Sequence, residues 1–185
     1  VIHAPVRDRA AIEKLRVFEA EEGLGYVTAA IRMIRKELDG KVPLIGFAGA
    51  PFTIASYLVE GGKSNDYRIA KNLMWSDPEA WNLLMSKIAE VVRRYLRAQV
   101  EAGAQAIQLF DSWVGALSPQ DYAESVAPHV HHILSDLEKT GVPVIHFGTG
   151  TSALLELQRD AGGTVIGVDH RVRLGNAMAF DANVG

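Results

Sequence analysis

The chain has 185 residues, of which 48% are hydrophobic and 22% charged, and its formal net charge at pH 7 is −3. These values are typical of a globular protein of about one domain, without the basic excess expected of a nucleic-acid-binding protein. The absence of cysteine excludes disulfides, thiolate-ligated zinc and thiol nucleophiles. No run approaches the roughly 18 apolar residues of a membrane span.

The first third of the sequence predicts two helices, a buried strand and a third helix. A short helix is expected over 9–18, and apolar residues recur at helical spacing over 24–38. The apolar run 44–47 predicts a strand. The small residues after it lead to Pro51, which suits the first turn of a helix that ends at Gly61.

The remainder alternates helices with three more short apolar strands. The Ser-Asp-Pro-Glu run that starts at Ser76 is a strong helix start, and Ser118 is suited to cap a later helix. The expected helices are 64–75, 78–100, 118–139, 153–160 and one from about 172, and the expected strands are 105–110, 144–147 and 165–168.

Four apolar strands that alternate with helices predict an α/β fold with a parallel sheet. The strands lack polar alternation, so we expect both of their faces to be buried. Unusual residues follow the strands rather than precede them, which places a site at the carboxyl ends, as in a (β/α)8 TIM barrel. A complete barrel needs roughly 200–250 residues, so the chain would supply about four βα units. An open nucleotide-binding sheet is the alternative, although GAPF after the first strand is not a phosphate-binding signature.

Two segments that follow strands carry the main candidate ligand-binding side chains. Asp111 and Ser112 close the strand 105–110, where they could hold a polar substrate or cap the next turn. Tyr57 lies in the helix after the first strand. It could reach a ligand bound at the carboxyl ends of the strands, or it could be a core tyrosine whose hydroxyl is hydrogen-bonded within the protein.

The remaining candidates are weaker. His146 lies within a strand, where we expect a structural role. Asp169 ends the fourth strand, where we expect its carboxylate to cap the following turn. The three histidines within 118–139 lack the spacing of a metal-binding motif, so no metal site is expected there. The glycine turn 149–151 could bind phosphate through backbone N–H groups, which is a weak signal.

Three stretches resemble the uroporphyrinogen decarboxylase family in order and spacing. They are PLIGFAGAPFTIASYLVEGG (43–62), AGAQAIQLFDSWVGALSPQDY (102–122) and GVPVIHFGTGTSALLELQRDAGGTVIGVD (141–169). The resemblance covers nearly the whole chain, and few other families share GFAGAPFT followed by SYLVEGG. It implies a TIM barrel in which residues 1–185 form a single incomplete domain, the central part of the barrel.

The resemblance also implies a function. Members of the family are lyases that remove the four acetate carboxyls of uroporphyrinogen III to give coproporphyrinogen III in heme biosynthesis. They use no metal and no organic cofactor. They act as cytoplasmic homodimers. The charge balance of the chain and the lack of a membrane span separately predict no nucleic-acid or membrane partner.

Carried over by motif, the resemblance makes Tyr57 and Ser112 substrate-contacting residues and Phe47 part of an apolar wall. The family's central aspartate, N-terminal arginines and C-terminal histidine match no residue of this sequence, so the resemblance assigns no catalytic residue. These groups would precede Val1 or follow Gly185. We therefore expect the isolated chain to be inactive.

Two other functions stay open. A truncated paralogue with a binding or assembly role would also lack those segments. Zinc methyltransferases that act on corrinoid-bound methyl groups share the superfamily, with a His-x-Cys pair where this chain has His146, Phe147 and Gly148. The lack of cysteine disfavours a methyltransferase, because the zinc would lose its thiolate ligands.

Overall fold

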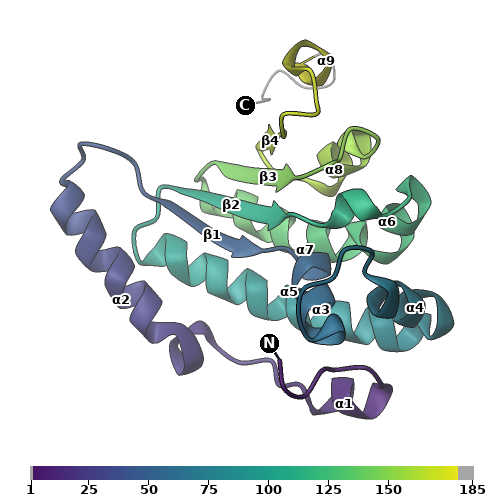
Figure 1. Ribbon diagram of the computed structural model, residues 1–185. Helices are drawn as coiled ribbons and strands as arrows, with labels where there is room; N and C mark the ends of the chain where they lie inside the picture. Colours follow the sequence, from purple (N-terminus) through teal and green to yellow (C-terminus); the bar gives the residue numbers. More distant parts are fainter. Residues whose placement is uncertain (1, 179–185) are drawn as a thin grey trace.

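A parallel four-stranded sheet forms the centre of the computed structural model, which describes residues 2–178. The strands are β1 (Ile45–Gly49), β2 (Ala106–Asp111), β3 (Val144–Gly148) and β4 (Val165–Gly167). Each strand pairs with the next one along the chain, in the order β1-β2-β3-β4 (Figure 1). Strands that follow one another in this way, with helices between them, form an arc of a (β/α)8 barrel, whereas a doubly wound sheet reverses its order. The predicted α/β fold is confirmed, and each predicted strand end lies within two residues of the observed one.

The helices agree with the prediction in number and order up to residue 118. They are α1 (Arg9–Lys14), α2 (Ala20–Leu38), α3 (Pro51–Glu60), α4 (Arg68–Ser76), α5 (Pro78–Glu101), α6 (Pro119–Ser125), α7 (Ala127–Leu137), α8 (Leu155–Ala161) and α9 (Leu174–Met178), with short 3₁₀ turns η1 (Val114–Ala116) and η2 (Glu138–Thr140). The predicted helix from about residue 172 corresponds to α9, and any part of it beyond Met178 lies outside the described residues. Among residues 2–178, none of the helices is long and apolar enough to span a membrane.

The expected single helix over 118–139 is wrong, because the chain forms two helices that meet at Val126. Val126 has φ −130° and ψ −52°, outside the regular helical range. Pro128 lies in the first turn of α7, where it has no N–H to donate to the carbonyl four residues earlier. The proline therefore ends α6 and starts α7, although apolar residues continue at helical spacing across the break.

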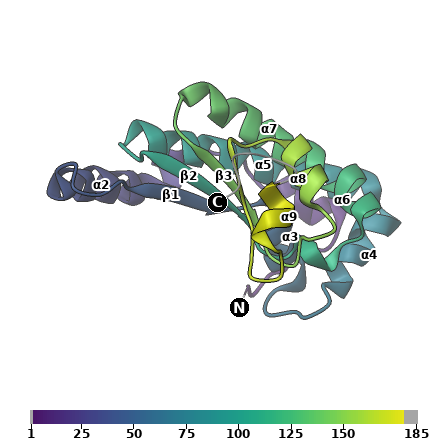
Figure 2. The same ribbon diagram turned by 90° about the horizontal axis from the view of Figure 1, so that it is seen from above.

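Helices cover one face of the sheet. Figure 2 shows α5 and α7 lying together along that face. The side chains of Ile107 and Leu109 point to the helices and are fully buried, whereas Phe47 on the other face is 61% exposed. The expectation that both faces are buried is therefore not met within the described residues, because α5 and α7 lie along the same side of the sheet.

One buried side chain ties the longest helix to the first strand. Gln99 of α5 accepts a hydrogen bond from the Phe47 N–H (3.0 Å) and donates one to the Phe47 carbonyl (2.9 Å). Gly46 makes this approach possible, since a Cβ atom there would lie 2.6 Å from the Gln99 side-chain oxygen. The amide of Gln99 thus satisfies both backbone polar groups of one residue in an edge strand of the described sheet.

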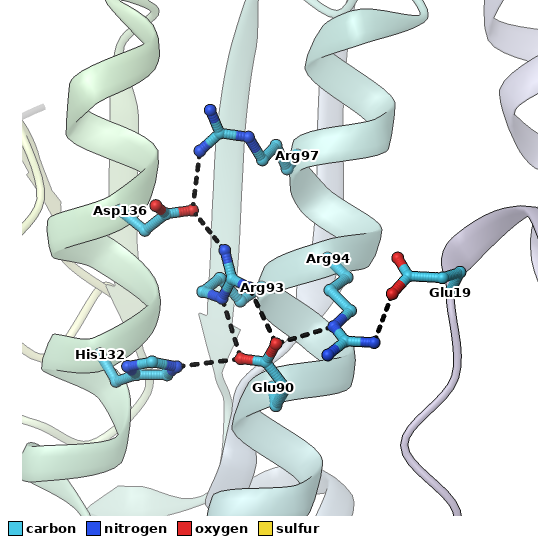
Figure 3. A network of polar contacts seen from close by, with 7 residues as sticks. All are labelled: Glu19, Glu90, Arg93, Arg94, Arg97, His132 and Asp136. Atoms are coloured by element: carbon cyan, nitrogen blue, oxygen red, sulfur yellow. Dashed lines mark hydrogen bonds and ion pairs between the residues drawn. The ribbon is translucent and has the colours of Figure 1, made fainter.

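A network of ion pairs joins α5 to α7 and to the segment before α2 (Figure 3). The Glu90 carboxylate accepts hydrogen bonds from Arg93 (2.8 Å) and Arg94 (2.7 Å) of its own helix and lies 3.1 Å from the His132 ring of α7. Arg93 also reaches Asp136 of α7 at 2.9 Å. The Arg93 hydrogen bond, together with those of His132 and Arg94, holds the pKa of Glu90 well below its usual value of 4.5.

We predict that Gln99→Ala lowers the free energy of unfolding by about 1–3 kcal/mol, because it leaves the N–H and C=O of Phe47 without their partner. Urea denaturation of the chain measures this change. The matched control is Gln120→Ala, since Gln120 is exposed on α6 and bonds only Glu124 of the same helix. Equal stability of the two variants would contradict the role assigned to Gln99.

We predict that Glu90→Gln lowers the free energy of unfolding by about 1–2 kcal/mol at neutral pH. The expected loss is modest because solvent weakens the ion pairs of a partly exposed network. A carboxylate with a lowered pKa contributes stability above its unfolded pKa, and this contribution is lost as pH falls below about 4.5. The variant should therefore also show a shallower loss of stability in acid.

Thermal melts of both proteins from pH 7 to 3 measure the effect of Glu90. Glu101→Gln is the control, because the Glu101 side chain is 69% exposed and its ion pair with Arg97 is long, at 3.7 Å. The Glu90 side chain is 24% exposed, and its ion pair with Arg94 measures 2.7 Å. A Glu101 variant that matches the Glu90 variant in both stability and pH dependence would rule out a special role for the network.

Candidate functional site

The loops at the carboxyl ends of the strands are bonded to one another. The Thr149 hydroxyl after β3 donates to the carbonyl of Ser112 after β2. The Gly150 N–H donates to the Asp169 carboxylate after β4 (2.8 Å), which also accepts from Arg171 (2.9 Å). These contacts, led by the Gly150 hydrogen bond, lower the pKa of Asp169. Asp169 also accepts a hydrogen bond from the Arg171 N–H (3.0 Å) in its own turn, and the Gly150 amide is occupied rather than free for a phosphate.

Tyr57 lines a cavity of about 660 Å³ at this end of the molecule. Its side chain is 48% exposed, so the alternative of a buried core tyrosine is wrong. The Tyr57 ring lies 4.2 Å from that of Trp113, measured between centroids, and Trp113 stacks on Tyr67 at 5.0 Å. Trp113 directly follows Ser112 in the chain, so the cavity joins the helix after β1 to the loop after β2.

The loop that closes the cavity, residues 61–67, is fixed at both ends. Gly61 ends α3 with φ +81°, a conformation that glycine adopts without strain. The Glu60 carboxylate then accepts hydrogen bonds from the first amides of α4, those of Ile69 (2.9 Å) and Ala70 (3.1 Å).

Tyr67 is held in an unusual conformation beside the same cavity. Its φ of +53° is uncommon for a bulky side chain, and its N–H bonds the Ser64 hydroxyl oxygen at 3.0 Å. Stacking on Trp113 helps to keep this ring in place. Strained backbone of this kind is often found at ligand sites, where the surroundings hold it.

Phe47 and Ser112 lie near the same strand ends. Phe47 forms an aromatic row across the uncovered face of the sheet, with Phe110 of β2 at 5.8 Å and Phe147 of β3 a further 5.6 Å away. Phe110 lies two residues before Ser112, which is half-buried. Of the three predicted site residues, Tyr57 lines the cavity from α3, Ser112 directly follows β2, and Phe47 is the middle residue of β1 on the open face. Phe47 and Ser112 are not among the described residues that line the Tyr57 cavity.

Asp111 does not lie in this mouth. It is fully buried on the helix-facing side of the sheet, with a carboxylate oxygen 3.8 Å from the Nε2 atom of His146. His146 is also fully buried, and its Nδ1 atom lies 3.2 Å from the Gln158 carbonyl. Burial raises the pKa of Asp111. Asp111 and His146 are thus buried together between the sheet and the helices, away from the Tyr57 cavity.

The three histidines of the 118–139 segment are placed apart. His131 bonds the Ala161 carbonyl (3.1 Å) and His132 bonds Glu90. Burial, with the charge of His132, lowers the pKa of His129 to about 4. Within residues 2–178, no group of three histidine, aspartate or glutamate side chains is arranged to hold a metal ion.

The other large cavities are less suited to a ligand of defined chemistry. A cavity of about 350 Å³ on the outer side of α5 is lined by Arg93, Arg94 and Arg97, each of which is ion-paired to a carboxylate. A second cavity of about 780 Å³ beside α4 mixes Glu60 and Asp66 with basic residues.

Sequence reasoning identified Tyr57 but not most of the other residues that line its cavity, among them Lys63, Tyr67 and Trp113. Trp113 had a usable signal, because it follows Ser112 at a strand end. The positions of Lys63 and Tyr67 depend on the shape of the loop between α3 and α4, which no periodicity in the sequence describes.

Comparisons with known proteins identify the family of the chain. The family described as "Uroporphyrinogen decarboxylase (URO-D)" matches residues 1–185. The protein named uroporphyrinogen decarboxylase from Sorangium cellulosum is 78% identical over 177 residues, which are 96% of this chain and 51% of the relative. The one from Carboxydothermus hydrogenoformans is 54% identical over 187 residues, covering 100% of this chain and 53% of the relative.

The chain spans about half the length of the curated relatives it matches. Among solved structures, a methyltransferase from Methanosarcina mazei superposes with a TM-score of 0.81 at 19% identity, over 98% of this chain and 53% of that one. Identity this low indicates a shared fold alone. The family match over the whole sequence decides the assignment: the chain belongs to the uroporphyrinogen decarboxylase family.

Proposed function

We propose that this chain supplies part of the substrate site of a uroporphyrinogen decarboxylase. The reaction removes the four acetate carboxyls of uroporphyrinogen III and gives coproporphyrinogen III. The observation that carries the proposal is the half-exposed Tyr57 in an aromatic-walled cavity at the carboxyl ends of parallel strands, where barrel enzymes bind their substrates. The names of the relatives support the choice of reaction.

In this proposal the residues of the chain bind and orient the macrocycle. The Tyr57 and Ser112 hydroxyls donate hydrogen bonds to carboxylate arms, and Phe47 packs against the carbon skeleton. Loss of carbon dioxide requires protonation of a pyrrole carbon, which leaves positive charge on the ring. The resemblance assigns the stabilisation of that charge to an aspartate with no counterpart among residues 1–185, so preorganised charge from elsewhere completes the site.

The same proposal includes the finer properties that the resemblance implies. Residues 1–185 form one incomplete domain, the central part of the barrel, and the complete enzyme is a cytoplasmic homodimer that needs no metal or organic cofactor. Zinc-dependent methyl transfer is the weaker candidate, because a chain without cysteine cannot supply thiolate ligands.

A chimera tests the proposal directly. The matched half of the Sorangium cellulosum relative is replaced by this chain, which is 78% identical to it over 177 residues. We expect the chimera to decarboxylate uroporphyrinogen III at a rate within about tenfold of the relative, because volume-conserving changes are tolerated in a related core. Separation of the products by carboxyl number measures the rate.

The isolated chain is assayed beside the chimera and should show no turnover. A folded, dimeric chimera without decarboxylase activity would refute the proposal. A chimera that binds the macrocycle tightly but does not turn it over would instead indicate that the chain has the binding role of a paralogue.

We predict that Tyr57→Phe lowers kcat/KM of the chimera about tenfold, since it removes one hydrogen bond to a charged group and keeps the ring in contact with Trp113. Tyr26→Phe is the matched control, because Tyr26 is exposed on α2, away from the cavity. Unchanged kinetics for the Tyr57 variant would remove Tyr57 from the site.

A further inference from the structure

The Tyr57 cavity has an uneven charge. Among the described residues 2–178 that line it, Lys63 is the one with a formal charge, and none is a carboxylate. Lys63 is exposed, and among residues 2–178 its ammonium group has no ion-pair or hydrogen-bond partner. The described part of the cavity wall therefore carries one cation, that of Lys63, and Tyr57 lines the same cavity.

The acidic residues nearest in sequence do not line this cavity. The Glu60 carboxylate is bonded to the backbone amides at the start of α4. Asp66 lines the neighbouring cavity together with Arg68 and Lys71. The loop between α3 and α4 (Figure 1) thus separates a mixed-charge cavity from a purely cationic one, which is suited to an anion.

The fixed ends of the loop hold the Lys63 backbone at the edge of the aromatic wall. The side chain is a compact positive charge on a flexible stem, so it can follow a carboxylate at the end of a flexible arm. Tyr57 and Trp113 offer an apolar surface for the methylene groups of the same arm. The combination fits a carboxyalkyl substituent better than a phosphate, for which a site normally offers several convergent backbone N–H groups.

The chemistry of decarboxylation decides which arm this is. A carboxylate that reacts loses its negative charge as carbon dioxide leaves and its electron pair moves to the ring. A lysine bound to that carboxylate would stabilise the ground state more than the transition state and would slow the reaction. Lys63 is therefore suited to an arm that keeps its carboxylate during the turnover in progress.

We propose that Lys63 is a specificity-determining residue that binds a non-reacting carboxylate arm of the tetrapyrrole. This inference rests on the proposed function, which supplies the polycarboxylate substrate. The interaction is the same in the ground state and the transition state, so it contributes to KM rather than to kcat.

The test uses the chimera described above, with Lys63→Ala, Lys63→Arg and, as a control for net charge, Lys41→Ala. Lys41 is exposed before β1, at the opposite end of the strands. We expect Lys63→Ala to raise KM for uroporphyrinogen III about tenfold with kcat within twofold, and to weaken the dependence of kcat/KM on salt. Lys63→Arg should restore most of the loss, and Lys41→Ala should leave both constants unchanged.

The possible failures are distinguishable. An active chimera in which Lys63→Ala leaves KM and salt dependence unchanged overturns the role of Lys63 and leaves the proposed function intact. A Lys63→Ala variant that loses kcat at constant KM, or that Lys63→Arg does not rescue, also overturns it. A folded but inactive unmodified chimera overturns the proposed function, and this inference with it.

Discussion

Parallel pairing of β1, β2, β3 and β4 in chain order is the constraint on which the rest of the structure depends. Parallel strands must all end at the same edge, so the segments after β1, β2, β3 and β4 meet there whatever their sequences. Tyr57, Ser112 and Thr149 come from three such segments and are far apart in the chain. The helices cannot bring these segments together on their own, because each contributes only to one connection.

The one-sided helical layer gives the sheet two different faces. Ile107 and Leu109 pack under α5 and α7, whereas Phe47, Phe110 and Phe147 form a row on the other side. In a barrel this second face lies inside, where its side chains meet those of the remaining strands and the ligand. The aromatic row is thus apolar surface that the described residues leave uncovered, and it explains why the strand sequences have no polar alternation.

Much of this organisation could be predicted from sequence, since it follows from local rules. Strand runs, the Pro51 and Pro78 helix starts and the Ser118 cap each depend on a few neighbouring residues. Pro128 was misjudged because apolar spacing continues across the break, although the missing N–H ends the helix. The cavity was only half predictable. Tyr57 was a candidate from its place in the helix after the first strand, and the resemblance favoured it, whereas Lys63 depends on a loop shape set by Glu60 and Tyr67.

The close contact between the loop after β2 and the loop after β3 limits how the sequence can diverge. Gly115 lies directly against the backbone of residues 149 and 150, and a Cβ atom at that position would collide with the Thr149 carbonyl. The turn after β2 and the turn after β3 therefore share one van der Waals boundary. Neither turn can accept a larger residue at this boundary without a compensating change in the other, so the two segments must evolve as a pair.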